Sequence, residues 1–448
     1  MTLAGALRAR LYRDAIDRRA AEYEPRRPDA ERAVIQLASL NREWARVVAT
    51  TEHWGSLVAG GQLPQHFASL AEFASAVPTT TRQAVQRHGS AMASRSRPPD
   101  MVRMTGGSTA APIQLPAWKS EQLSARDDMW CGRSWYGVTP GSRLFLLWGH
   151  GHLLGSGVRG WIRARRLEIS DRLLGYHRFS AYDLQPAKMR RAADDLLAFR
   201  PDYVIGYSVA LDLFARANAD RKAALRGVGA RVVLGTAESF PSEDSVQILE
   251  DTFGCPTGME YGAVETGVVA HTHPSGDYRV FWRNHLVEAV GQGPRKRLLL
   301  TSLYPRAFPL VRYEIGDEVE AAGDSDDALA GLAEFRRVVG RCNDYVILRD
   351  GFTVHSEVFS HAVRPCSAVR GFQVVHDGDE VRLHYTSEDG LPPEQANGIR
   401  ARLAKVHPSL GAVRLERVPA LDQTIAGKTR MIIREGPAAP QPHGRSLP

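Results

Sequence analysis

Between residues 143 and 265, short apolar runs alternate with longer helical segments, and this alternation constrains the fold most strongly. Residues 143–148, RLFLLW, have the composition of a buried strand. Two further stretches, DLLAFRPDYVIGYSVALDLFA and ARVVLGTAESFPSEDSVQILEDTF, each place a short strand next to helical sequence. Strands that alternate with helices are typical of layered α/β domains. We therefore predict an α/β fold class, with mixed sheets in a large N-terminal domain.

The pattern changes on both sides of this region. Residues 1–95 carry apolar residues at helical spacing, which predicts a mainly helical start and a surface helix over residues 1–27. From Arg297 onward the apolar residues alternate at period two, as they do in antiparallel strands. Asp350-Gly351 then marks the turn of a hairpin.

The last hundred or so residues supply a separate apolar core. A second hairpin around residues 377–379 precedes a helix in PPEQANGIRARLAKVHP and a strand in AVRLERV. We predict an N-terminal domain over residues 1–338, a small α+β domain over 339–435, and a disordered Pro- and Gly-rich tail over 436–448.

Composition narrows the classes of partner. The net charge of +7 over 448 residues favours anionic ligands such as nucleotides, phosphates or coenzyme A. The basic residues are scattered, which argues against a nucleic-acid partner. No run of about 20 apolar residues is present, so we expect no membrane span. With no secretory signal pattern and four widely spaced cysteines, we expect a cytoplasmic protein. The sequence says nothing about oligomeric state.

Five short segments carry residues suited to nucleotide chemistry. The first, TGGSTAAP at residues 105–112, has small residues that let backbone N–H groups approach phosphate oxygens. The second, Gly235-Thr236-Ala237-Glu238, follows a strand, where ligand crevices form in α/β sheets. The third, Tyr261-Gly262-Ala263-Val264-Glu265, combines an aromatic face for a purine with a carboxylate for Mg²⁺. Each segment alone also fits an ordinary turn.

The remaining two segments lie toward the C-terminus. RYEIGD at residues 312–317 places the carboxylate of Asp317 after a glycine, where it can accept both hydroxyls of a ribose. GRCND at residues 340–344 is followed by Gly427-Lys428. A mobile lysine can offset charge that develops on a phosphate and a carboxylate during attack.

In this order and spacing, the five segments resemble those of the adenylate-forming superfamily of acyl-CoA synthetases, adenylation domains and luciferases. The likeness is greater to its phenylacetate–CoA ligase-like branch, which includes capsule-biosynthesis-type members, and it spans roughly residues 100–433. The resemblance implies a large N-terminal domain, a mobile C-terminal lid, and activation of a small carboxylic acid by ATP and Mg²⁺ as an acyl-adenylate.

The resemblance also implies a role for individual residues. Five residues would cradle the ATP phosphates: Thr105, Gly106, Gly107, Ser108 and Thr109. Ala237 and Glu238 would lie along the adenine, with Tyr261 and Gly262 against it. Glu265 would bind Mg²⁺ and Asp317 the ribose. Among the C-terminal residues, Arg341 would lie near the nucleotide, Asn343 would be the hinge, and Lys428 would be the adenylation lysine.

Three departures from the family pattern bear on the chemistry. Ala111 replaces the usual phosphate-loop lysine, Val264 replaces a hydroxyl residue, and Asn343 replaces the usual hinge aspartate. The predicted acceptor of the acyl group is coenzyme A, by family analogy. An amine acceptor in an amide-forming ligase is the alternative, and a catalytically impaired nucleotide-binding relative is a third hypothesis.

Other residues suggest rival or additional sites. GSGVRG at residues 155–160 is a GxGxxG sequence, but it starts several residues after its strand and is interpreted as a flexible wall of the acyl pocket. His150, His152, Tyr207 and Ser208 are weak candidates for that pocket. The histidines at 271, 273 and 285 could ligate a metal or be ordinary loop histidines. A basic run at residues 159–166 could contact coenzyme A phosphates or form a solvated helix face.

Overall fold

The chain forms two compact units in a computed structural model. The structure describes residues 2–24, 26–104, 113–148, 157–181, 184–291, 295–321, 331–339, 345–363, 365–366, 368–369, 371–377, 380–421 and 431–434. Within these ranges, the first unit comprises residues 2–104, 113–179 and 193–339, and the second comprises 180–192 and those from 345 onward. No helix in the described ranges has the length and apolar character needed to cross a membrane.

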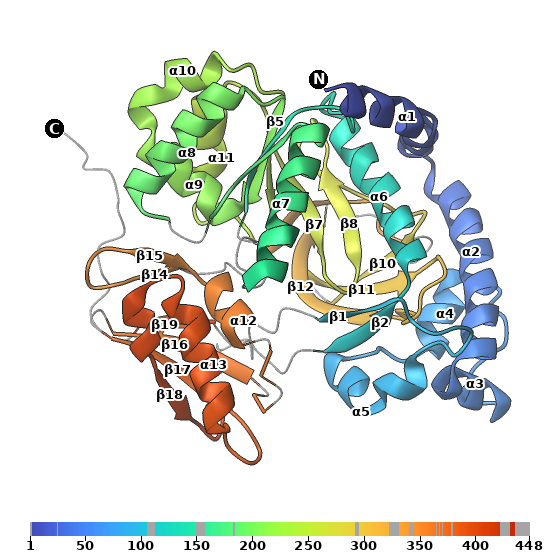
Figure 1. The fold of residues 1–448 in the computed structure, drawn as a ribbon. Helices are drawn as coiled ribbons and strands as arrows, with labels where there is room; N and C mark the ends of the chain where they lie inside the picture. Colours follow the sequence, from blue (N-terminus) through green and yellow to red (C-terminus); the bar gives the residue numbers. More distant parts are fainter. Residues whose placement is uncertain are drawn as a thin grey trace. The chain divides into compact units, whose positions relative to one another are not determined.

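The first unit begins with helices, as the apolar spacing predicted (Figure 1). They are α1 (Leu3–Tyr23), α2 (Asp29–Thr50), α3 (Glu52–Ala59), α4 (Leu70–Ala76) and α5 (Arg82–Met92). Thr2 caps α1 by accepting a hydrogen bond from the Gly5 N–H, at 3.0 Å. Trp44, Trp54 and Phe67 form a buried aromatic cluster under α2 and α3. This cluster gives the helical segment an apolar core.

A sheet of eleven strands follows, in the order β10-β11-β12-β13-β9-β8-β7-β6-β5-β3-β4. Its parallel half contains β3 (Leu144–Leu147), β4 (Tyr176–Phe179), β5 (Tyr203–Tyr207), β6 (Val233–Thr236) and β7 (Thr257–Ala263). Helices accompany these strands: α7 (Gly157–Leu174), α8 (Pro186–Phe199), α9 (Ser208–Ala217), η2 (Ala219–Arg221), α10 (Lys222–Arg226) and α11 (Ser245–Phe253). Every residue of β5 is buried, which is typical of a parallel strand covered on both faces. The predicted α/β class is confirmed.

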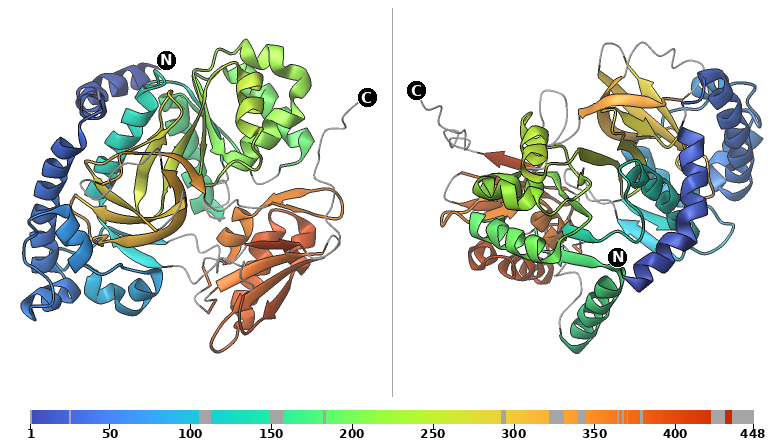
Figure 2. Two further views of the ribbon diagram at one scale, coloured as in Figure 1. Left: turned by 180° about the vertical axis from the view of Figure 1, so that it is seen from behind. Right: turned by 90° about the horizontal axis from the view of Figure 1, so that it is seen from above.

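The other half of the sheet is antiparallel; the period-two pattern from Arg297 predicted its last three strands, and the three strands before Arg297 were not predicted. It contains β8 (Gly267–Thr272), β9 (Tyr278–Val280), β10 (His285–Val290), β11 (Arg295–Ser302), β12 (Tyr313–Ala321) and β13 (Glu334–Val339). Strand β13 pairs with β12 on one side and with β9 on the other. It therefore joins the strands β10, β11 and β12 to the strands β9 and β8. Figure 2 shows this half curving round rather than continuing flat.

Two smaller elements complete the first unit. Strands β1 (Met101–Met104) and β2 (Gln114–Ala117) pair as an antiparallel hairpin, and its connecting residues 105–112 lie outside the described ranges. At the start of helix α6 (Lys119–Ser134), the Glu121 carboxylate accepts the Trp118 N–H at 2.8 Å.

The second unit is a small α+β body. Its described elements are β14 (Tyr345–Ile347), β15 (Thr353–His355), α12 (Glu357–Val363), β16 (Gly371–His376), β17 (Val381–Thr386), α13 (Pro393–Ala404), η3 (Pro408–Ala412), β18 (Arg414–Arg417) and β19 (Ile432–Arg434). Both predicted hairpins are present, β14–β15 and β16–β17. Gly351 adopts φ 83° at the first turn, which explains the glycine after Asp350. The core of this unit includes Phe359, Val374 and Leu403.

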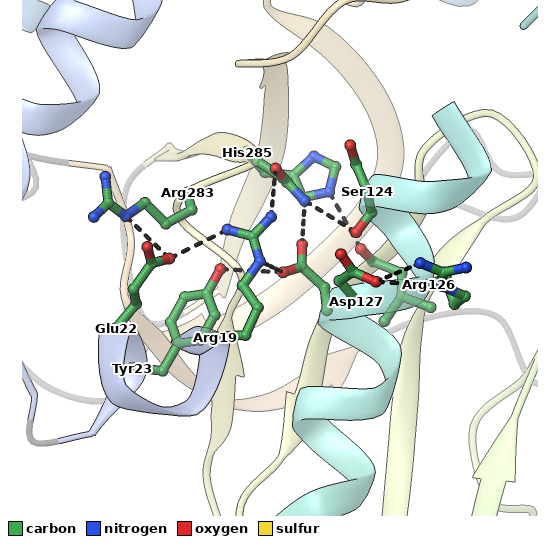
Figure 3. Close-up of polar contacts among 11 residues, drawn as sticks. Arg19, Glu22, Tyr23, Ser124, Arg126, Asp127, Arg283 and His285 are labelled. Atoms are coloured by element: carbon green, nitrogen blue, oxygen red, sulfur yellow. Dashed lines mark hydrogen bonds and ion pairs between the residues drawn. The ribbon is translucent and has the colours of Figure 1, made fainter. Parts of the chain in front are cut away.

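Buried polar contacts of Asp128 join α1 to α6 and to the rest of the first unit (Figure 3). The Arg19 Nε atom lies 3.1 Å from a carboxylate oxygen of Asp128, whose side chain is fully buried in α6. Tyr23 and Asn284 also donate hydrogen bonds to this carboxylate. Burial raises the pKa of Asp128 to about 7, and the Arg19 charge and the two hydrogen bonds offset that rise only in part. The carboxyl group therefore binds a proton more tightly in the folded state than in the unfolded chain.

This shift predicts a specific pH dependence of stability. Because the folded pKa exceeds the unfolded value of 3.8, the contribution of Asp128 is fully present below pH 3.8 and is lost as the pH rises to about 7. Asp128→Asn keeps the shape and removes the titration. We expect the difference in thermal midpoint between wild type and variant to fall steadily from pH 4 to 7 and to level off above it. A difference that stays constant across this range would contradict the assignment.

Candidate functional site

Three groups of predicted site residues lie at the ends of neighbouring parallel strands. Strands β3, β5, β6 and β7 run parallel and adjacent, so their carboxyl ends meet at one edge of the sheet. Tyr207 and Ser208 stand at the end of β5, Ala237 and Glu238 follow β6, and Glu265 follows β7. Ligands of open α/β sheets bind at such an edge. The fold therefore brings together residues that lie far apart in the sequence.

The ends of β5 and β6 are joined by hydrogen bonds of Glu238. Its carboxylate accepts the Val209 N–H at 3.2 Å, at the start of α9, where a negative charge is favoured. Its backbone carbonyl accepts the Ser208 hydroxyl at 2.8 Å. Tyr207 stacks on Trp148, with ring centroids 4.3 Å apart. All three predicted residues, Tyr207, Ser208 and Glu238, are buried, so they form a rigid wall at this edge.

Ala237 has an unusual backbone conformation. Its φ of 71° lies in the left-handed region, which residues other than glycine rarely adopt. Such strain persists only where the surrounding structure enforces it, and it is frequent at binding sites. Here the enforcing contacts are those of the next residue, Glu238, with Ser208 and Val209.

The turn between β7 and β8 depends on glycine. A Cβ atom on Gly262 would overlap the carbonyl oxygen of Gly267, so residue 262 cannot carry a side chain without a backbone shift. The pairing of β7 with β8 changes register between Tyr261 and Gly262. The Thr266 hydroxyl accepts the Ala263 N–H at 2.8 Å and closes the turn. This explains why a glycine follows Tyr261 in the motif.

Glu265 projects from this turn and is held from two sides. The Tyr313 hydroxyl donates to its carboxylate at 3.4 Å. The buried guanidinium of Arg306 donates to the backbone carbonyls of Glu265 and Thr266. The main chain at Glu265 is therefore fixed, and its carboxylate is directed next to β12.

Tyr261 and Asp317 are in direct contact. The Tyr261 hydroxyl donates to the Asp317 carboxylate at 3.2 Å, although the two residues lie on β7 and β12. Burial, followed by the charge of Asp317, raises the pKa of Tyr261 well above its usual value, so the phenol stays protonated. The Tyr261 ring packs edge-on against Tyr278 and Phe335 and is largely covered.

A bulge in β12 places Asp317. Leu299 of β11 pairs with Glu314, whereas Arg297, two residues away, pairs with Glu318. The extra β12 residues form a bulge around Gly316, whose φ is 91°. The glycine of the IGD sequence therefore allows the bulge that sets the position of the aspartate.

Arg312, in the same motif, has a structural partner. Its guanidinium is bound to the Glu288 carboxylate of β10, with an Nη2 to Oε1 distance of 2.9 Å. It also donates to the Val77 carbonyl, at 2.5 Å. The φ of Arg312 is 42°, so these contacts also hold a strained backbone.

The three candidate metal-binding histidines have protein partners. His271 Nδ1 lies 2.8 Å from the Thr272 carbonyl oxygen, and His285 Nε2 lies 3.2 Å from that of Val268. Burial lowers the pKa of His285 to about 3 and also lowers that of His271. His273 Nε2 lies 2.7 Å from the carboxylate of Glu24, the residue that follows α1. Within the described ranges, no three histidine, cysteine or carboxylate side chains are grouped so that they could hold a metal ion.

The chemistry of Glu265 fits a magnesium ion bound together with a nucleotide. Mg²⁺ prefers hard oxygen ligands, and proteins commonly supply one or two carboxylates while phosphates and water supply the rest. Glu265 offers one carboxylate at a sheet edge, fixed by Arg306 through the main chain. A single protein ligand of this kind therefore matches the predicted role.

Several predicted residues lie outside the described ranges. They are Thr105, Gly106, Gly107, Ser108, Thr109, His150, His152, Arg341, Asn343 and Lys428. The GxGxxG sequence is described only from Gly157, where α7 begins.

Two buried ionic residues that support the site were not predicted. The Glu121 carboxylate accepts the Ala307 N–H at 3.0 Å, and its other oxygen lies 3.7 Å from Nε of Arg306. This ties α6 to the loop that carries Arg306, and through Arg306 to Glu265. One signal was available, because Arg306 stands within the otherwise apolar sequence LYPRAFPL.

Comparison with known proteins identifies the fold. No family model matches the sequence. Over 192 residues the chain is 24% identical to "Protein CapK" of Staphylococcus aureus, and this match spans only 41% of each protein. Among solved structures, it is similar to 2-hydroxyisobutyryl-CoA ligase in complex with 2-HIB-AMP and CoA in the thioesterification state. The TM-score is 0.56, with 17% identity over 91% of both chains.

A second structure of that ligase agrees. Its open conformation, also with 2-HIB-AMP and CoA, gives a TM-score of 0.54 at 17% identity, over 91% of this chain and 92% of the ligase. At sequence identities this low, the structural similarity establishes the fold alone. The resemblance stated from the sequence is therefore confirmed at the level of fold: this chain has the fold of adenylate-forming acyl-CoA ligases.

The turn at Gly262 allows a direct test of the local geometry. We expect Gly262→Ala to lower the thermal midpoint by roughly 5 °C or more, because the new methyl group overlaps the Gly267 carbonyl. Gly89→Ala, within α5, is the matched control: a Cβ there meets only ordinary contacts, and alanine is the better helix former. Equal midpoints for the two variants would show that the turn can relax.

Proposed function

We propose that this chain, which has the acyl-CoA ligase fold, uses ATP to activate a carboxylic acid as an acyl-adenylate and transfers the acyl group to coenzyme A. We place it with the phenylacetate–CoA ligase-like enzymes, on the strength of the phrases FRPDYVIGYSVALDLFA and LVRYEIGDEVE. The similarity of the fold to a CoA ligase along 91% of the chain supports the reaction class.

The hydrogen bond between Tyr261 and Asp317 carries the proposal. It connects the motif assigned to adenine and Mg²⁺ with the motif assigned to ribose. The contact from Tyr313 to Glu265 makes a second connection between the same two segments. A single nucleotide needs the groups that bind its base, its ribose and its phosphates in one place. Two turns with unrelated roles would have no reason to be in contact.

In the proposed first step, a carboxylate oxygen of the acid attacks the α-phosphorus of ATP. The bond from that phosphorus to the pyrophosphate oxygen breaks, which gives acyl-AMP and pyrophosphate. Asp317 accepts hydrogen bonds from the ribose hydroxyls and so orients the α-phosphorus for in-line attack. Mg²⁺, held by Glu265 and phosphate oxygens, would neutralise charge on the departing pyrophosphate.

The remaining roles are assigned from the motif match. Residues 105–109 bind phosphate oxygens, Arg341 lies near the nucleotide, and Lys428 offsets negative charge at the reacting centre. In the second step, the thiolate of coenzyme A attacks the acyl carbon and AMP departs, with a change of lid position about Asn343. Val264, whose side chain is exposed, cannot donate the hydrogen bond of a family hydroxyl, so phosphate binding relies on the other groups.

The function is tested by pyrophosphate release over a panel of carboxylic acids. We expect release that requires ATP, Mg²⁺ and one class of acid, and turnover that increases when coenzyme A is added. Turnover that increases with an amine instead would assign an amide ligase. If no acid supports release while ATP still binds, the chain is a nucleotide-binding relative without this activity.

Lys428 provides the sharpest catalytic variant. Lys428→Ala should lower acid-dependent exchange of pyrophosphate into ATP roughly 100-fold or more, because the charge that stabilises the transition state is removed. Lys405→Ala, an exposed lysine at the end of α13, is the control and should leave exchange unchanged. Normal exchange in the Lys428 variant would remove this residue from the mechanism.

Asp317 and Tyr261 test the ribose assignment. Asp317→Asn should raise the KM for ATP roughly tenfold, because a charge-assisted hydrogen bond acceptor is lost, with a smaller effect on kcat. Tyr261→Phe removes only the hydroxyl that orients Asp317 and should raise the KM about threefold. An unchanged KM for ATP in both variants would be incompatible with a nucleotide at this position.

A further inference from the structure

Two helices of the first unit expose the residues that surface helices usually bury. Of the 13 large apolar side chains exposed in the described part of the chain, three lie on α1 and four on α7. Those on α1 are Leu3, Leu7 and Leu11, and those on α7 are Trp161, Ile162, Ile169 and Leu173. The other six are spread singly over the remaining elements. The seven side chains are therefore a concentration rather than the usual scatter.

The polarity of α7 is inverted. Trp161, Ile169 and Leu173 share one face, because residues at spacings of four lie above one another on a helix. They are exposed by 65%, 57% and 57%. The opposite side carries Asp171, which is buried and paired with Arg178 of β4 at 2.6 Å. An ordinary amphipathic helix would turn its apolar face toward the protein.

Helix α1 also exposes a row of apolar side chains, over its N-terminal half. Its leucines recur every four residues, and Leu3 is 90% exposed. On its inner side, the Arg8 guanidinium donates to the Tyr176 hydroxyl at 2.6 Å and lies over the Trp130 ring. Each helix thus holds a charged group on its inner side while a row of apolar side chains faces solvent; on α1, Ile16 and Tyr23 also point inward and are buried.

The two faces meet at one end. The Thr2 hydroxyl, next to Leu3, donates to the Leu173 carbonyl at 2.6 Å, so the start of α1 touches the end of α7. In the view from above, α7 projects from the body of the first unit and α1 starts beside it (Figure 2). We use the name apolar–basic face for the seven apolar side chains together with the six arginines described as exposed on these helices: Arg10, Arg13, Arg18, Arg165, Arg166 and Arg172.

The arginines indicate what covers this face. On α7, Glu168 is ion-paired with Arg165 and Arg172, so three exposed guanidinium groups stand against one carboxylate. On α1, the exposed arginines are Arg10, Arg13 and Arg18 and the exposed carboxylates are Asp14 and Asp17, so positive charge is in excess on both helices. A two-fold contact with a second copy would bring these positive groups toward themselves, which is unfavourable. An anionic lipid surface suits them, because arginine can place its aliphatic stem among apolar groups and its charge among phosphates. Tryptophan is also favoured at a membrane–water interface.

We propose that the apolar–basic face binds the surface of an anionic phospholipid bilayer, with α7 lying in the interface. The apolar side chains enter the boundary between headgroups and acyl chains, and the arginines contact lipid phosphates. The net charge of +7 adds a general attraction to such a surface. This inference rests on exposure and charge and is independent of the proposed function.

The test is co-sedimentation of the full chain with vesicles of phosphatidylcholine, with and without phosphatidylglycerol. We expect binding to the vesicles that contain phosphatidylglycerol, little binding to phosphatidylcholine alone, and weaker binding at high salt. The double variant Trp161→Ser/Ile169→Ser should lower the partition coefficient roughly tenfold, since it removes two inserted side chains. Arg165→Gln/Arg166→Gln should lower binding only to the anionic vesicles.

Matched control variants distinguish binding through this face from nonspecific hydrophobic binding. Leu123→Ser and Val246→Ser replace apolar side chains that are exposed elsewhere and should leave vesicle binding unchanged. All four target side chains are exposed, so the thermal midpoint should not change in either double variant. The proposal is overturned if wild type ignores anionic vesicles or if Trp161→Ser/Ile169→Ser binds as wild type does. It is also overturned if wild type, without binding lipid, forms a dimer that this variant lacks, which would assign the face to a second copy.

Discussion

The candidate site depends on one buried guanidinium, that of Arg306. A charged group removed from water must find hydrogen-bond and charge partners, or it destabilises the fold. Arg306 finds them in the carbonyls of Glu265 and Thr266, the Tyr304 hydroxyl and the Glu121 carboxylate. Those partners come from α6, the loop before β12 and the turn after β7. The position of Glu265 is therefore decided by residues that never appear in its own motif.

The sequence predicted the elements well because periodicity reports burial directly. The apolar run of β5 and the period-two pattern from Arg297 each reflect how many faces of a strand are covered. The sequence predicted far fewer of the side-chain contacts that join one element to another. An ion pair such as that of Glu121 with Arg306 joins residues far apart in the chain and leaves no local pattern. Isolated charges in a sequence are usually read as solvated, and these two are buried.

For the site residues, too, the sequence predicted the local motifs but not the contacts between them. Tyr261 and Asp317 each stand in a short motif, and periodicity does not place them near one another. Their contact arises because β13 pairs with both β12 and β9, so that the sheet curves and β12 comes to face β7. The glycines at 262 and 316 are explained only by that geometry, one by a close carbonyl and the other by a bulge. Residue spacing alone could not reveal either requirement.

The insertion of β13 between β12 and β9 also bears on how the chain folds during synthesis. Phe335 pairs with Tyr278, so the edge of β9 stays open until more than fifty residues beyond it have left the ribosome. Contacts of such long range form slowly, since the intervening chain must be ordered first. Until then β9 presents unpaired backbone groups, which invite association with other chains. Nascent or truncated forms that end before β13 are thus the species most exposed to aggregation and most dependent on chaperones.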